Sequence, residues 1–136
     1  PLGNSEDELV WQPYSAKLLT ETKAQGTPYL LEFTADWCIT CLVNKGLVVN
    51  TAPLLEVFKS DTVVMMQGDW TRPDPVISQY LAGYGRYGIP FNVVYGPGSP
   101  QGHPLPEILT KAGVMNAMAG ASGPARISDN NSRDGG

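Results

Sequence analysis

The sequence predicts an α/β fold in which helices flank a central mixed sheet of four strands. Near-continuous apolar runs at residues 28–34, 61–67 and 91–95 are typical of strands that are covered on both faces. Stretches with helical spacing separate these runs. Short right-handed connections make the first two strands parallel, whereas a Gly/Pro-rich turn at residues 96–102 makes the last two antiparallel.

The helices are predicted from their spacing and from the residues that begin and end them. They are expected at residues 15–25 with a stop at Gly26, 38–50, 54–59 with Pro53 in the first turn, 74–84, and 111–118 behind a Thr110 cap. A short fourth strand is expected at residues 105–109. Pro104 and Pro106 confine that strand to an edge of the sheet. The resulting order, α-β-α-β-α-β-β-α, is that of the thioredoxin fold.

The composition indicates one domain with flexible ends. The chain has 136 residues, of which 42% are hydrophobic and 16% charged, and its net charge is −4. The domain is expected at residues 11–119. The segment 1–10, whose Pro1-Leu2-Gly3 resembles a cloning scar, and the polar segment 120–136 are expected to be flexible. Scattered basic residues argue against nucleic acid as a partner, and no apolar run approaches the ~18–20 residues of a membrane span.

Cys38 and Cys41, the two cysteines of the chain, stand at the end of the first predicted strand. A Cys-x-x-Cys pair at the start of a helix places one sulfur near unpaired N–H groups, which favours the reactive thiolate. A purely structural disulfide is an alternative, but so short a loop removes little chain entropy. Structural zinc is another, but such sites need about four ligands, and His103 is the single histidine. The pattern therefore predicts a redox-active dithiol.

The residues around this pair resemble a known family. The run EFTADWCITC from Glu32 to Cys41, followed by Gly88-Ile89-Pro90, resembles the thioredoxin superfamily. Within that superfamily, the motifs ADWC at 35–38 and GDWT at 68–71 resemble the C-terminal periplasmic domain of the thiol:disulfide interchange protein DsbD family and its ScsB-type relatives. The resemblance covers residues 14–119.

That resemblance implies a protein-disulfide reductase domain in the periplasm, as part of an inner-membrane protein. Such a domain takes electrons from a membrane-embedded donor domain and passes them to a periplasmic thiol/disulfide acceptor protein. It needs no cofactor beyond the Cys38–Cys41 disulfide and does not itself insert into the membrane. The alternatives are a freestanding thioredoxin-like reductase or cytochrome-maturation protein, and a redox-inactive module that docks peptides.

Roles follow for individual residues. Cys38 is expected to be the exposed nucleophile and Cys41 the deeper, resolving thiol. Pro90 is expected to follow a cis peptide bond, the alternative being a trans proline that opens a strand. The resemblance implies that the Pro90 loop faces the cysteines and that the Ile89 backbone pairs with an incoming peptide. Trp37 is expected to form a contact surface, although a core position is the alternative.

Three charged residues are expected to tune the thiols. Glu32, in an apolar strand, would be a carboxyl beneath the cysteines that raises the thiol pKa and accepts a proton from Cys41, or else an edge carboxylate facing water. Asp36 would cap the helix or add negative charge near Cys38. Lys45 stands where the family commonly has a second acid and would lower the thiol pKa. No charge lies between the cysteines, so the expected couple is reducing or intermediate, on the order of −200 to −270 mV.

Overall fold

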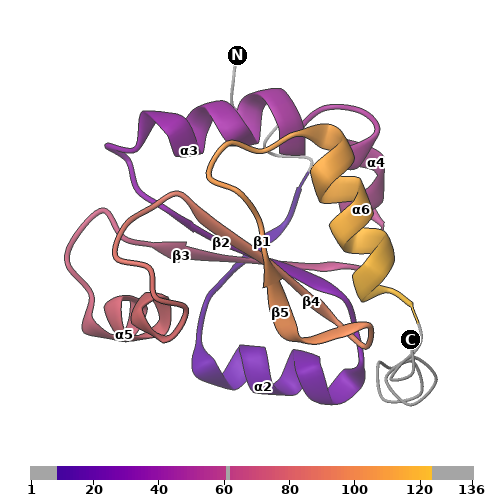
Figure 1. The fold of residues 1–136 in the computed structure, drawn as a ribbon, viewed down its shortest axis with the longest axis horizontal. Coiled ribbons are helices and arrows are strands. Elements are labelled where there is room, and N and C mark those ends of the chain that lie inside the picture. Colours follow the sequence, from indigo (N-terminus) through magenta and orange to yellow (C-terminus); the bar gives the residue numbers. More distant parts are fainter. Residues whose placement is uncertain (1–8, 61, 124–136) are drawn as a thin grey trace.

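The computed structural model describes residues 9–60 and 62–123, and in them it has a five-stranded mixed sheet in the order β1-β3-β2-β4-β5 (Figure 1). The strands are β1 (Trp11–Pro13), β2 (Tyr29–Thr34), β3 (Val64–Asp69), β4 (Phe91–Gly96) and β5 (Ser99–Pro104). The helices are α2 (Ala16–Gln25), α3 (Ile39–Asn44), the π-helix η1 (Lys45–Val49), α4 (Leu54–Lys59), α5 (Pro75–Gly83) and α6 (Lys111–Ala121). Most of the two segments expected to be flexible, 1–10 and 120–136, lies outside the described residues.

The predicted α/β class and the predicted strand directions are confirmed. β2 lies at the centre of the sheet, parallel to β3 and antiparallel to β4, while β4 and β5 are antiparallel. All six residues of β2 are buried, as its continuous apolar character predicts.

Two strand predictions were wrong. The predicted sheet had four strands, and the structure adds β1, which pairs in parallel with β3 at one edge. The last strand is β5, not residues 105–109. Those residues form a loop whose Leu105 and Leu109 are buried in the core, so their apolar character serves packing rather than strand formation.

Most helix predictions are confirmed, including the end signals at Gly26 and Thr110, whereas Pro53 is the N-cap of α4 rather than part of its first turn. Gly26 ends α2 with a φ of 72°, a left-handed conformation that glycine adopts without strain. The Thr110 side chain caps α6 by accepting a hydrogen bond from the Gly113 N–H. The single helix predicted at 38–50 is instead divided into α3 and η1. The helix predicted at 111–118 continues to Ala121, beyond the boundary expected at residue 119.

Two cores lie on opposite faces of the sheet. One packs under α4, α6 and η1 and includes Leu30 of β2, while the other packs against α2 and α5 and includes Leu31 and Phe33. Figure 1 shows the same layers, with α3 and α6 on one side of the sheet and α2 and α5 on the other. Because side chains alternate along a strand, Glu32 points to the same side as Leu30. The fold thus places the Glu32 carboxyl beneath α3.

Candidate active site

Cys38 and Cys41 form a disulfide at the start of α3, with their Cα atoms 5.3 Å apart. Cys38 is the N-cap residue of α3, and its Sγ accepts a hydrogen bond from the Cys41 N–H at 3.2 Å. This is the sulfur position at the helix terminus that the sequence predicted. Cys38 is 6% exposed and Cys41 is 1% exposed, so Cys38 is the more accessible of the two residues, although both are buried.

The predicted carboxyl beneath the cysteines is buried and paired. Glu32 is 3% exposed, and its Oε1 lies 3.5 Å from the Lys45 Nζ and accepts a hydrogen bond from the Gln67 Nε2 at 3.0 Å. The alternative of an edge carboxylate facing water is therefore wrong. The next residue, Phe33, places its carbonyl oxygen 3.8 Å from the Cys41 Sγ, so the part of β2 that carries Glu32 lies against Cys41.

Lys45 comes from one helical turn beyond Cys41, at the start of η1. Its side chain is 12% exposed and lies over the Trp11 ring, 5.2 Å from the ring centroid. A buried carboxylate needs such a partner, because an unpaired buried charge is costly. Lys45 is therefore the cation that offsets the negative charge of Glu32.

The segment before Cys38 is fixed by Thr71, which follows β3. The Thr71 hydroxyl oxygen accepts from the Asp36 N–H at 2.9 Å, and the Thr71 carbonyl accepts from the Trp37 Nε1 at 3.1 Å. Asp36 does not cap α3, because Cys38 occupies the cap position. Trp37 is 60% exposed, so its ring is surface rather than core. The sequence alone does not indicate this role of Thr71, although the residue belongs to the GDWT motif at 68–71.

Thr71 is held in turn by Asp69. The Thr71 hydroxyl and backbone N–H both donate to Asp69 Oδ1, at 2.6 and 2.9 Å. Both bonds stabilise the ionised carboxylate and so hold the pKa of Asp69 below its ordinary value of 3.8. The bond from the Thr71 hydroxyl has the larger effect.

Asp69→Asn is expected to lower the stability of the fold at neutral pH and to change it little at acid pH. A carboxyl with a lowered folded pKa stabilises the native state above its unfolded pKa, and this contribution is lost as the pH falls through the folded pKa. The gap in urea midpoint between wild type and Asp69→Asn should be largest near about pH 6 and should shrink towards about pH 2. Thr71→Val should reduce the same pH dependence. A gap that stays constant with pH would contradict this account.

Ile89 and Pro90 complete the surroundings of the disulfide. The Ile89–Pro90 peptide bond is cis, as predicted, and Pro90 is buried. Ile89 packs against Ala35 and the two cysteines. The loop therefore faces the disulfide, as the family resemblance implied.

A hollow of about 520 Å³ opens beside Trp37 and Ile89. Its other lining residues are Trp70, Thr71, Pro73, Ser78, Tyr87 and Gly88. Aromatic and aliphatic side chains thus predominate in the lining of this hollow beside the disulfide.

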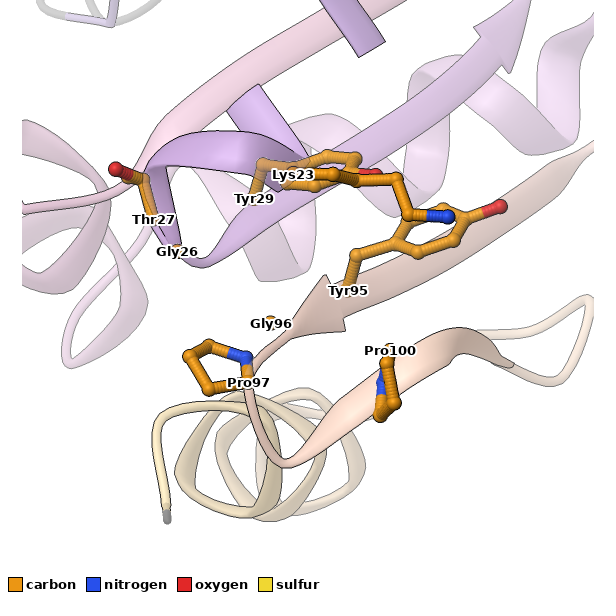
Figure 2. A pocket seen from close by; sticks show the side chains of 8 residues that line it. All are labelled: Lys23, Gly26, Thr27, Tyr29, Tyr95, Gly96, Pro97 and Pro100. Atoms are coloured by element: carbon orange, nitrogen blue, oxygen red, sulfur yellow. The ribbon is translucent and has the colours of Figure 1, made fainter. Parts of the chain in front are cut away.

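A second, smaller pocket of about 240 Å³ lies at the opposite end of β2 (Figure 2). Tyr29 and Tyr95 stack there with ring centroids 4.7 Å apart, and Lys23 Nζ lies 5.6 Å from the centroid of the Tyr95 ring. Tyr29 begins β2 whereas the cysteines follow its end, so this pocket is separate from the disulfide. Its lining brings no thiol or carboxylate, and we assign it no part in the redox chemistry.

The family assignment rests on the sequence as well as on this geometry. A family model described as thioredoxin-like matches residues 10–97, which is more than half of the chain. The chain belongs to the thioredoxin-like family. Among the described residues, no group of three or more His, Cys, Asp and Glu side chains is arranged to hold a metal ion. Within that same part of the chain, no helix has the length and apolarity needed to cross a membrane.

Relatives within the thioredoxin-like family confirm the predicted resemblance to DsbD. The chain is 30% identical over 106 residues to thiol:disulfide interchange protein DsbD 1 of Pseudomonas aeruginosa, covering 76% of this chain and 18% of that protein. It is also 30% identical over 89 residues to DsbD of Vibrio cholerae, covering 65% of this chain and 14% of the relative. The chain thus spans less than a fifth of the length of these two relatives.

Solved structures agree on the fold. The oxidised C-terminal domain of Neisseria meningitidis DsbD is 21% identical, with a TM-score of 0.61 over 79% of this chain and 95% of that domain. A thioredoxin from Thermus thermophilus is 16% identical, with a TM-score of 0.63 over 95% of this chain and 94% of the other. The thioredoxin fold is therefore shown, and a Cys-x-x-Cys disulfide within it is consistent with thiol:disulfide exchange.

Proposed function

We propose that this domain is a protein-disulfide reductase that moves electrons by dithiol/disulfide exchange at Cys38 and Cys41. The observation that carries the proposal is the Cys38 sulfur at the N-terminus of α3, where the Cys41 N–H donates to it. A hydrogen bond and the positive end of a helix both favour the thiolate of the reduced protein. The similarity to DsbD C-terminal domains supports the same chemistry.

The first half of the reaction forms a mixed disulfide. The Cys38 thiolate attacks one sulfur of the partner's disulfide, so that bond breaks and the other partner sulfur leaves as a thiolate that takes up a proton. Trp37 directly precedes Cys38, and Ile89, which Pro90 follows, packs against the two cysteines; these three residues are proposed to hold the incoming chain.

The second half releases the partner. Cys41 loses its proton and attacks the Cys38 sulfur, which closes the Cys38–Cys41 disulfide and frees the partner's second thiol. Two electrons pass to the partner and the domain is left oxidised. Glu32 is proposed to accept the Cys41 proton, since it lies on the α3 side of β2 next to the residue whose carbonyl contacts Cys41 Sγ. Lys45 and Asp36 are proposed to tune the charge at the site.

The similarity to DsbD also suggests where the electrons come from and where they go. We propose a membrane-embedded donor domain that reduces this domain, and a periplasmic thiol/disulfide protein that this domain reduces. The chain would then work in the periplasm as one domain of an inner-membrane protein. The expected potential stays on the order of −200 to −270 mV, within the range of thioredoxins and glutaredoxins.

The proposal is tested with insulin as a disulfide probe. The reduced domain, freed of excess reductant, should reduce insulin disulfides and form one Cys38–Cys41 disulfide for each disulfide reduced. Equilibration with glutathione buffers would give the potential. In the reduced protein, brief iodoacetamide treatment should label Cys38 first, because Cys41 is the more deeply buried.

Two results would contradict the proposal. A domain that keeps both thiols in the presence of insulin and oxidised glutathione would be a docking module rather than a reductase. Preferential labelling of Cys41 would reverse the assigned order of nucleophile and resolving thiol.

A further inference from the structure

The outer face of α3 and η1 carries aliphatic side chains, where a helix facing water usually carries charged ones. Ile39 is 74% exposed, Leu42 48%, Val43 47% and Leu47 66%. Lys45 is the single charged residue between positions 39 and 49, and it turns inward to Glu32. The helix that carries the disulfide thus presents aliphatic side chains to solvent and turns its charged side chain inward.

One further exposed aliphatic side chain is held beside this face. Asn44 Nδ2 donates to the Glu107 carbonyl at 2.8 Å, and the Leu109 N–H donates to Asn44 Oδ1 at 3.1 Å. These bonds fix the loop around Ile108, which is 65% exposed, against α3. We call Ile39, Leu42, Val43, Leu47 and Ile108 the outer α3 patch.

The outer α3 patch is continuous with the redox site. Ile39 directly follows Cys38, and Trp37, which is 60% exposed, directly precedes it. Because Cys38 is only 6% exposed, a partner sulfur can reach it only if the partner's surface lies against these neighbours. A protein that exchanges disulfides with Cys38 must therefore cover at least the Cys38 end of the patch.

We propose that the outer α3 patch docks the protein that exchanges disulfides at Cys38, and that this partner surrounds its own cysteine with an uncharged apolar surface. This inference rests on the proposed function. The apolar surfaces of the two proteins are removed from water when they bind, and this burial supplies the attraction. The patch has no charge of its own, so a charged partner surface would lose its hydration there without gaining a counter-charge.

The test uses two synthetic helical peptides, each with one cysteine held as a mixed disulfide with glutathione. One peptide has leucines on the face beside its cysteine, and the other has glutamines at the same positions. The reduced domain attacks each mixed disulfide through Cys38 and closes Cys38–Cys41, so that peptide and glutathione both leave as thiols. The readout is the ratio of kcat/KM between the two peptides, in which a general change in thiol reactivity cancels.

Wild type is expected to prefer the leucine peptide by about tenfold or more, as expected when a few apolar anchors dominate an interface. Leu42→Gln/Val43→Gln/Leu47→Gln should remove most of this preference. These side chains are exposed and glutamine favours helix, so the variant should fold, which its circular dichroism would verify. Val10→Gln is the matched control, since Val10 is 76% exposed and is one of the residues that line another surface hollow. It should keep the wild-type ratio.

An unchanged ratio in the triple variant would overturn the inference. So would concentration-dependent dimers of wild type that the triple variant abolishes, because a second copy would then occupy the patch. Binding of wild type, but not of the triple variant, to phosphatidylcholine vesicles would overturn it in favour of lipid. If reduced wild type fails to react with either peptide and with Ellman's reagent, the proposed function itself is wrong.

Discussion

Cys41→Ala is expected to convert a transient exchange into a stable mixed disulfide between Cys38 and a substrate protein. The Cys38 sulfur, at the start of α3, can still attack a disulfide, but no second thiol remains to release the product. Turnover of insulin should fall to background, while a covalent adduct accumulates that disappears on reduction. Non-reducing electrophoresis followed by mass spectrometry would measure the adduct and locate it on Cys38.

Cys38→Ala is the matched control. It should lose turnover equally but trap little substrate, because Cys41 is 1% exposed and a partner sulfur cannot reach it. Equal trapping by the two variants, or trapping by neither, would contradict the division of roles between the cysteines.

The sequence predicts those parts of this fold that depend on local chemistry. The buried run of β2, the glycine that ends α2, the Thr110 cap of α6 and the cis bond before Pro90 each follow from residues close together in the chain. The disulfide follows from two cysteines three positions apart. In these places local preference and tertiary structure agree.

The two strands that the sequence did not predict, β5 and β1, depend instead on distant partners. β5 contains two prolines, a glycine and a histidine and has no alternating apolar pattern, so pairing with β4 rather than intrinsic preference makes it a strand. β1 has only three residues and ends in Pro13, and its pairing with β3 joins segments about fifty residues apart. Edge strands of this kind leave little signal in a sequence.

The site shows the same division. The spacing of Cys38 and Cys41 predicts the redox pair, and Trp37 is indicated by its place directly before Cys38. By contrast, the contacts of Lys45 with Glu32 and of Thr71 with Asp36 and Trp37 join residues from different elements. The sequence predicts that Lys45 lowers the thiol pKa, but it does not predict the pairing of Lys45 with Glu32. The π-helical turn that begins at Lys45 could not be anticipated from residue preferences, and there the side chain turns inward to the carboxyl.

Lys45→Met is expected to destabilise the protein by about 3 kcal/mol, the lower end of the cost of removing one partner from a buried ion pair. Methionine keeps much of the aliphatic stem that packs over Trp11 but leaves the Glu32 carboxylate, 3% exposed, without its cation. Urea unfolding at neutral pH would measure the loss. Glu32→Gln/Lys45→Met should recover most of it, because the double variant buries no charge at this position.

The matched control for this stability change is a surface pair. Lys17 lies 4.0 Å from Glu21 on α2, with side chains 84% and 54% exposed. Lys17→Met should change stability by no more than about 0.5 kcal/mol, since exposed pairs contribute little. A similar loss for Lys17→Met and Lys45→Met would show that the burial of the Glu32–Lys45 pair does not matter.

The same Lys45→Met variant should make the couple more reducing. With Lys45 present, the Glu32 charge beneath α3 is largely offset, so it destabilises the thiolate of the reduced protein only slightly. Without Lys45, a carboxylate that stays ionised opposes a second negative charge nearby, and the reduced form becomes less stable relative to the disulfide. A potential on the order of 30 mV more negative would correspond to about 1.4 kcal/mol for the two-electron couple. Equilibration with glutathione would measure it. An unchanged potential in a folded Lys45→Met protein would mean either that the carboxyl has taken up a proton or that its charge does not reach the sulfurs. A further Glu32→Gln change would separate the two. It should raise stability clearly if the carboxyl is charged, because a buried uncompensated charge is removed, and should change stability little if the carboxyl is protonated.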